Sequence, residues 1–198
     1  MNRFHRILLI TSAGLLAWLG MQAVHELGHV LGAWATGGTV ERVVLHPLAI
    51  SRTDLGHNPQ PLVVAWAGPV VGILLPLGMW ICLALARAPL AWLARFFAGF
   101  CCLANGLYIG AGSLQKVGDA GDLLRHGSPI ALLWLFGLAV APAGLAIWNG
   151  LGRHFGFGGD APPISKAVAW GCAAALVATA AAMALVSALS ESVGGPLS

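Results

Sequence analysis

The chain has 198 residues, of which 58% are hydrophobic and only 9% are charged. With a mean hydropathy of +0.83, it lies outside the range of ordinary soluble domains, so the composition predicts an integral membrane protein. The formal net charge of +3 is small and spread along the chain, which argues against a nucleic-acid partner. The four cysteines lie in apolar runs without a C-x-x-C pair, and we expect structural roles for them: Cys82, Cys101, Cys102 and Cys172.

The first apolar segment contains an unusual group of ionisable residues. It runs from Ile7 to about Ala35, longer than the roughly 20 residues that a bilayer core requires. Within it His25, Glu26 and His29 form an H-E-x-x-H sequence. Residues four apart lie on the same face of a helix, so both histidines can direct ring nitrogens at one point. Ionisable groups inside a membrane span are costly and rarely present without a function.

This residue set suits a zinc ion. Zinc accepts neutral imidazole, and a catalytic zinc site typically has three protein ligands and one open position. His25 and His29 are therefore the predicted metal ligands. Glu26, next to the first of them, is suited to act as a general base toward a water molecule that the metal activates.

The segment after this span is the most polar connection of the chain. Gly37 and Gly38 end the first helix, and the stretch from Thr39 to Gln60 has β-branched pieces broken by Pro47. This pattern predicts short strands. We also expect the part from Thr39 to Thr53 to offer an exposed strand edge to an unwound substrate.

Four further apolar segments complete the expected fold. They are Pro61 to Ala86, Ala91 to about Leu114, Pro129 to Trp148, which Pro142 interrupts, and Ile164 to Leu189, which follows a Gly-rich loop from Gly150 to Pro163. The predicted fold class is an all-α polytopic membrane protein with about five transmembrane helices and a short β-rich segment after the first. We expect a single membrane domain over residues 1–198, with a catalytic core at about 7–128 and additional helices at about 129–190.

A second polar cluster follows the third span and offers candidates for the third ligand. Asp119 is preferred because Gly118 permits a sharp turn back toward the first helix. Asp122 is the alternative, although a short helix would turn it toward Arg125. His126 would give a site of three histidines. Asn105, inside the third span, is typical of an interhelical hydrogen bond and is a possible supporting residue.

These residues resemble the site-2 protease family of intramembrane zinc metallopeptidases, in particular its compact bacterial members. The matching stretches are His25–His29, Gly37–Val40, Ala67–Pro69, Asn105 and Gly118–Ala120, which together cover roughly residues 20 to 130. The resemblance implies a three-helix catalytic core, a β-rich segment after the first core helix and an aspartate as third zinc ligand. Better-known members carry that aspartate in an Asn-Pro-x-x-Asp-Gly-like setting, whereas this chain lacks the proline and continues with Ala120.

The expected function is that of a zinc-dependent endopeptidase that hydrolyses peptide bonds of membrane-spanning or membrane-proximal substrates. One alternative is a zinc-binding membrane protein without proteolytic activity. Another is a small metal or proton transporter, in which intramembrane His and Asp would form a relay. The expected partners are a membrane protein or peptide substrate and the lipid bilayer. The expected location is the cell membrane, as a multi-pass protein of the bacterial inner membrane.

Two arguments about orientation disagree. With the N-terminus inside, six basic residues would lie on the inner side and four on the outer side, which weakly favours this arrangement. The inner residues would be Arg3, Arg6, Arg87, Arg95, Arg153 and Lys166, and the outer ones Arg42, Arg52, Lys116 and Arg125. The family resemblance implies instead that the site lies near the cytoplasmic face, and we expect this second orientation.

Overall fold

A computed structural model describes residues 3–48 and 50–194. In this part of the chain, five helices are long and apolar enough to cross a membrane. They are α1 (Arg3–Ala35), α2 (Pro61–Leu85), α3 (Ala91–Gln115), α5 (Ile130–Trp148) and α6 (Lys166–Gly194). The shorter elements are β1 (Val40–Val44), β2 (Arg52–Leu55), the helix α4 (Gly118–Arg125) and the 3-10 helix η1 (Leu151–Phe155). The predicted fold class, with about five spans and a β-rich segment after the first, is confirmed.

Three details differ from the sequence-based expectations. Helix α1 begins at Arg3 rather than at Ile7. Helix α5 continues across Pro142, as membrane helices can when neighbouring groups satisfy the freed backbone. The Gly-rich loop contains η1, whose Phe155 packs in a buried cluster with Leu9. This apolar contact explains why the loop is not wholly irregular.

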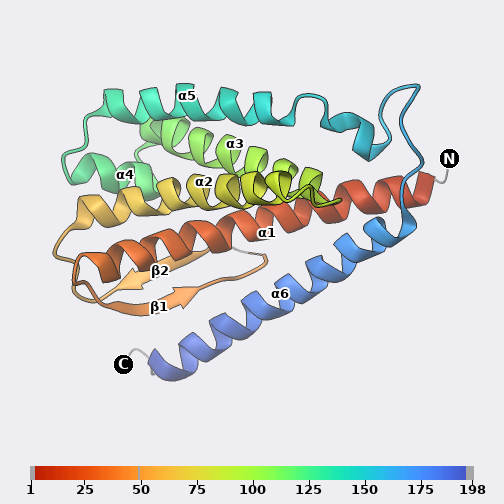
Figure 1. The fold of residues 1–198 in the computed structure, drawn as a ribbon. Helices are drawn as coiled ribbons and strands as arrows, with labels where there is room; N and C mark the ends of the chain where they lie inside the picture. Colours follow the sequence, from red (N-terminus) through yellow and green to blue (C-terminus); the bar gives the residue numbers. More distant parts are fainter. Residues whose placement is uncertain (1–2, 49, 195–198) are drawn as a thin grey trace.

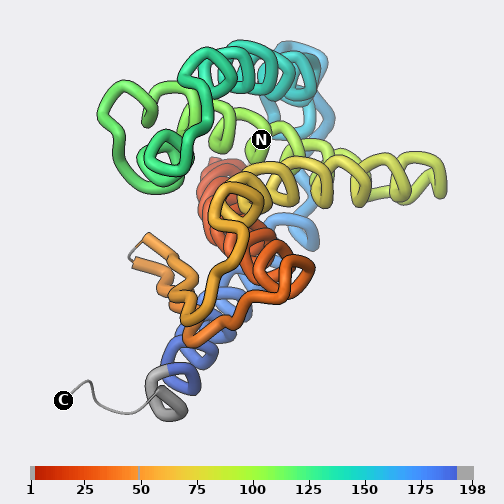
Figure 2. The backbone as a smooth tube through the Cα atoms, turned by 90° about the vertical axis from the view of Figure 1, so that its left-hand side faces the viewer, coloured from red at the N-terminus to blue at the C-terminus, as the bar shows by residue number. Residues whose placement is uncertain are grey.

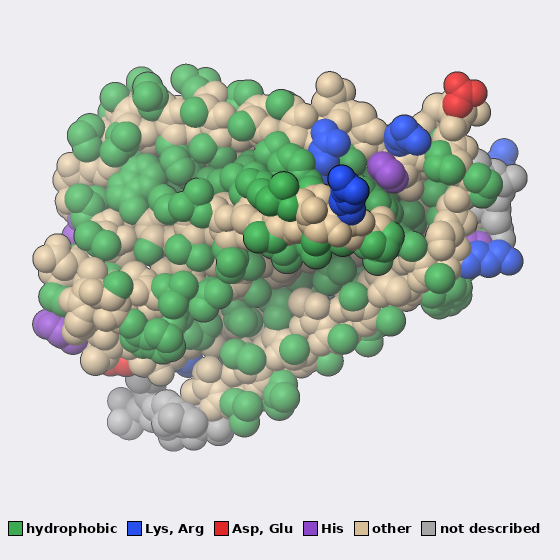
Figure 3. All heavy atoms as spheres, in the orientation of Figure 1, with side chains coloured by type: hydrophobic (Ala, Val, Ile, Leu, Met, Phe, Trp, Pro, Cys, Tyr) green, Lys and Arg blue, Asp and Glu red, His purple; other side chains and the backbone are tan. Residues whose placement is uncertain are grey.

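The helices pack around α1 and α3. Figure 1 shows α1 between α2 and α6, with α5 beyond α3. Small residues allow these close approaches. A Cβ atom at Gly110 of α3 would lie 3.0 Å from the Cα of Gly137 on α5, and such small-residue contacts are common between membrane helices. In Figure 3 hydrophobic side chains cover much of the visible face, as lipid contact requires.

Strands β1 and β2 form an antiparallel hairpin between α1 and α6. Val43 pairs with Thr53, and Val44 pairs with Arg52. At the end of β1, the Leu45 N–H donates to Ser187 Oγ at 3.0 Å, and Ser187 Oγ donates to the Leu45 carbonyl at 2.7 Å. Helix α6 therefore covers the backbone next to β1.

Candidate active site

One face of α1 carries a row of buried polar side chains. Gln22, His25, Glu26 and His29 follow helical spacing and are each at most 8% exposed. They line a cavity of about 600 Å³, to which the hairpin segment, α2, α3 and α4 also contribute. Figure 2 shows α4 and the hairpin projecting on the same side of α1. The H-E-x-x-H residues therefore face a space between the spans rather than lipid.

Hydrogen bonds on the far side of each ring fix how the two histidines present their nitrogens. His29 Nδ1 lies 2.9 Å from the Val64 carbonyl, which can only accept, so Nδ1 is the donor. His25 Nδ1 lies 2.7 Å from Asn105 Oδ1, and Asn105 Nδ2 donates to the Cys101 carbonyl at 2.9 Å. The Asn105 oxygen thus accepts from His25. In its neutral form each ring is therefore left with an Nε2 lone pair facing the cavity, the state in which imidazole binds a metal.

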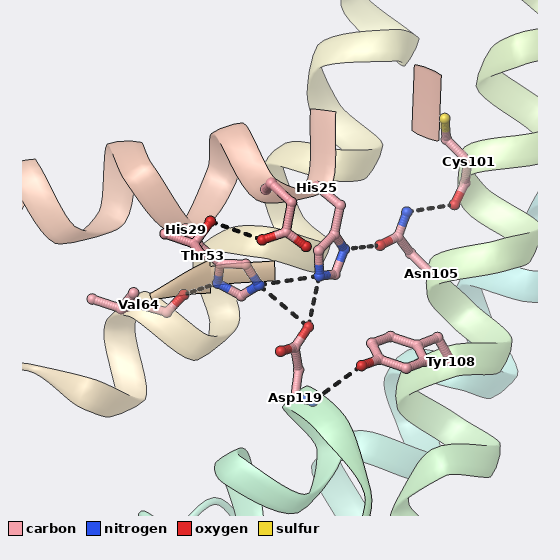
Figure 4. A network of polar contacts seen from close by, with 9 residues as sticks. His25, His29, Thr53, Val64, Cys101, Asn105, Tyr108 and Asp119 are labelled. Carbon is pink, nitrogen blue, oxygen red and sulfur yellow. Dashed lines mark hydrogen bonds and ion pairs between the residues drawn. The ribbon is translucent and has the colours of Figure 1, made fainter. Parts of the chain in front are cut away.

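The two Nε2 atoms converge with the Asp119 carboxylate (Figure 4). His25 Nε2 and His29 Nε2 are 3.1 Å apart, and Asp119 Oδ2 lies 2.6 Å and 3.3 Å from them, respectively. Ligands at the usual zinc bond lengths around a tetrahedral ion are about 3.3 Å from one another. Two of the three separations are close to this value, and the donor set of two imidazoles and a carboxylate is one that zinc accepts. The residues present therefore fit a zinc ion.

Glu26 lies beside the same point. Ligand atoms of His25, Glu26 and His29 all lie within 4.8 Å of one another, so the three residues form a possible metal-binding group. Glu26 Oε2 accepts a hydrogen bond of 2.8 Å from Thr53 Oγ1 on β2. This bond holds one carboxylate oxygen toward the hairpin. The second oxygen of Glu26 has no hydrogen-bond partner among the described residues.

Asp119 reaches the histidines because the chain turns sharply after α3. Gly118 has a φ of +54°, and the Asp119 N–H donates to the Tyr108 hydroxyl at 3.3 Å. Burial acts to raise the pKa of the Asp119 carboxyl, but the contacts of this carboxyl with His25 and His29, whose rings donate to it when they are protonated, outweigh burial and hold this pKa well below its ordinary value. Asp119 is therefore a carboxylate, the form that ligates metal.

The other two candidates for the third ligand are engaged elsewhere. The Asp122 carboxylate pairs with Arg125, as the helical spacing predicted. His126 Nδ1 donates to the main-chain carbonyl of Asp122 at 2.8 Å. Both residues line the cavity, but of the three candidates only Asp119 contacts His25 and His29 through its side chain.

Two glycines bring α2 against this face of α1. A Cβ at Gly28, inside the H-E-x-x-H sequence, would overlap the Ala67 carbonyl, and a Cβ at Gly68 would overlap the His29 ring. The Ala67–Pro69 stretch therefore serves close packing of α2 against α1. This packing also leaves the space that the His29 ring occupies.

Several residues at the site were not predicted from the sequence. Thr53 and Tyr108 carry no local signal, because their contacts depend on how the hairpin and α4 fold against α1 and α3. Gln22 had a weak signal, as a polar residue one turn before His25 in an apolar segment. Ser51 N–H donates to Gln22 Oε1 at 3.0 Å, and nothing in the sequence pattern predicts this hydrogen bond.

A family model described as Peptidase M50B-like matches residues 7–109. The chain belongs to this family. The match covers nearly all of α1, the hairpin, α2 and most of α3, so it includes the H-E-x-x-H residues and Asn105, whereas Asp119 lies beyond it. Neither the curated proteins nor the solved structures gave a match. The resemblance to site-2 proteases noted from the motifs is thereby confirmed at the level of the family.

Proposed function

We propose that this M50B-like protein is an intramembrane zinc endopeptidase. The observation that carries the proposal is the convergence of two histidine nitrogens and a carboxylate beside Glu26, in a cavity between membrane spans. The proposed substrates are membrane-spanning or membrane-proximal polypeptides. The proposed location is the cell membrane of a bacterium.

His25, His29 and Asp119 would hold the zinc, and Asn105 and the Val64 carbonyl would keep the two rings in the ligating tautomer. When bound there, zinc would polarise the scissile carbonyl and lower the pKa of a water molecule. Glu26 would accept a proton from this water and return it to the leaving amine. Thr53 would keep the Glu26 carboxylate from rotating away, through its hydrogen bond to Oε2.

Substrate geometry follows from the same cavity. A carbonyl locked in an intrahelical hydrogen bond is not open to attack, so a substrate helix must unwind locally before cleavage. Unwound backbone near lipid needs new hydrogen-bond partners. Residues 50–55 line the cavity, so the hairpin is the nearest element that could pair with such a segment.

The proposal is tested with Glu26→Gln in the full-length protein. Cleavage of membrane proteins should fall by about 10²–10⁴, the range for loss of a general base, while bound zinc should stay unchanged because Glu26 is not a ligand in this proposal. Zinc content is measured on the purified wild-type and Glu26→Gln proteins. Membrane proteins are then compared between cells that produce one or the other. Substrates should accumulate uncut only in the variant. Equal turnover of Glu26→Gln and wild type on a verified substrate would exclude the hydrolase mechanism.

A further inference from the structure

A second cavity, the apolar groove, lies on the face of α1 opposite the candidate active site. Four of its lining residues follow helical spacing on α1: Ala13, Leu16, Ala17 and Gly20. At 3.6 residues per turn, they lie on the side of α1 turned away from the H-E-x-x-H residues. The rest of the lining comes from the end of α2, the start of α3 and α6. Apart from the Cys172 thiol and the Thr179 hydroxyl, these side chains are apolar.

The size of the groove limits what can occupy it. Its volume is about 350 Å³. A helix with its side chains is about 10–12 Å across and rises about 5.4 Å per turn, so a helix segment of that volume would be shorter than one turn. A single hydrocarbon chain is much thinner and shares the apolar chemistry of the lining. All four helices that form the groove are candidate membrane spans, so lipid chains are the hydrocarbon beside it.

The end of the bundle next to the groove is strongly basic. Its helix ends and connections carry six basic residues, whereas Asp160 is the only acidic residue of these segments within the described chain. The six are Arg3, Arg6, Arg87, Arg95, Arg153 and Lys166. Figure 3 shows Lys and Arg side chains gathered toward this end of the visible face. Such an end attracts an anionic lipid headgroup and repels the cationic group of a zwitterionic one.

Arg87 lies at the rim of the groove. It belongs to the connection between α2 and α3, and it stands between Leu83 and Leu90, which both line the groove. The turn is held by Arg87 N–H, which donates to the Ala84 carbonyl at 3.0 Å, and by Ala88 N–H, which donates to the Leu83 carbonyl at 2.9 Å. The Arg87 side chain is exposed and has no hydrogen bond or ion pair among the described residues. A guanidinium group pairs with phosphate through two parallel hydrogen bonds.

The backbone at Arg87 suits glycine better than arginine. Its φ is +53°, in the left-handed region that other residues seldom adopt. Arginine occupies the position despite this preference, which indicates a function for its side chain. Two other arginines of this end are already engaged. Arg6 Nη1 donates to the Gly156 carbonyl at 3.4 Å, and Arg95 Nε donates to the Ile147 carbonyl at 2.8 Å.

We propose that the apolar groove and Arg87 form a binding site for an anionic glycerophospholipid. One acyl chain lies in the groove between α1, α2, α3 and α6, and the phosphate pairs with the Arg87 guanidinium. Hydrocarbon gains little by moving from the bilayer to an apolar protein surface, so the charge of the headgroup gives the site its selectivity. The site is separate from the proposed zinc centre and does not depend on proteolysis.

Native mass spectrometry of the full-length protein in detergent measures the headgroup preference. The probes are phosphatidylglycerol and phosphatidylcholine with the same acyl chains, supplied in equal amounts. Wild type should bind phosphatidylglycerol in preference. Arg87→Gly should weaken this binding about 5-fold, which corresponds to one basic residue at an anionic membrane surface, and Arg87→Lys should retain it. Arg153→Gln is the matched control, because Arg153 is an exposed basic residue of the same end that does not line the groove.

The place of the acyl chain is tested by filling the groove from α6. Thr179 lines the groove, so Thr179→Phe should put a ring where the chain lies and abolish the preference for phosphatidylglycerol. Val177→Phe is the control on the same helix, because Val177 is 70% exposed and does not line the groove. Glycerophosphoglycerol, the headgroup without its chains, should not displace phosphatidylglycerol from wild type.

Other roles for Arg87 and the groove give different results. Glycine suits the φ of +53°, so Arg87→Gly should unfold in lipid-free detergent at the wild-type temperature or above it, and its loss of lipid binding is then not due to a weakened turn. The proposal is overturned if Arg87→Gly keeps the wild-type preference for phosphatidylglycerol, or if wild type binds both lipids equally. Competition by glycerophosphoglycerol also overturns it. So does a dimer that Thr179→Phe dissociates, because a second copy of the chain would then fill the groove.

Discussion

At the scale of single residues, the site depends on groups that do not face the metal position. Asn105 and the Val64 carbonyl each accept from a histidine Nδ1, and such outer contacts fix both tautomer and ring orientation. The spacing of His25, Glu26 and His29 was readable from the sequence because it lies within one helix. The partner of Asn105 was not, because it depends on how α1 and α3 pack.

At the scale of single residues, the geometry makes its most specific prediction for the third zinc ligand. Asp119→Asn should strongly lower zinc occupancy and abolish activity, because a neutral amide replaces the carboxylate that lies 2.6 Å from His25 Nε2. Asp122→Asn is the matched control. It should leave bound zinc nearly unchanged, because Asp122 pairs with the exposed Arg125. Zinc is measured by metal analysis of both purified variants, and the reverse pattern would exchange the two roles.

At the scale of elements, the close approach of α2 to α1 sets the position of His29. A Cβ at Gly68 would overlap the ring carbons and Nε2 of His29. His29 Nδ1 is also bound to the Val64 carbonyl, one turn earlier on α2. Helix α2 therefore anchors the His29 ring through the Val64 carbonyl and leaves room for it at Gly68. A side chain at position 68 would fill that room.

Gly68→Ala should displace the His29 ring and reduce zinc binding, with a loss of stability of about 1–3 kcal/mol as for other overpacked sites. Gly78→Ala is the control on the same helix, since a Cβ there would have nothing within 4 Å. The measurements are zinc content and thermal unfolding in detergent. If Gly68→Ala binds zinc like Gly78→Ala, the proposed tight fit between α2 and His29 is wrong.

The hairpin shows where prediction from the sequence reaches its limit. Its position after the first span and its strand character were predicted from β-branched residues and Pro47. Its orientation was not, because two long-range contacts decide it. Ser187 of α6 binds the backbone at Leu45 beside β1, and Thr53 on β2 binds Glu26. The backbone at Leu45 is therefore covered, and β2, rather than β1, is the strand that lines the cavity.

At the scale of the whole molecule, the site and the C-terminal end of α6 lie at the same end of the helix bundle. The H-E-x-x-H residues occupy the C-terminal half of α1, and the hairpin beside them is held by Ser187, near the end of α6. Figure 1 shows the hairpin beside the C-terminal end of α6, at the opposite end of the bundle from the start of α1. The side of the membrane that the C-terminal end of α6 faces is therefore the side toward which the site lies.

This geometry makes the orientation in the membrane measurable with phosphatase fusions. The family resemblance implies a site near the cytoplasmic face, whereas the six-to-four distribution of basic residues favours the opposite arrangement by a thin margin. We expect a cytoplasmic C-terminus. A phosphatase that is active only outside the cytoplasm, fused after Ser198, should be inactive. The same enzyme fused before Met1 should be active, because the five candidate spans of the described residues would place the two ends on opposite sides. An active phosphatase at the C-terminal end would place the site on the outer side and show that the positive charges set the orientation.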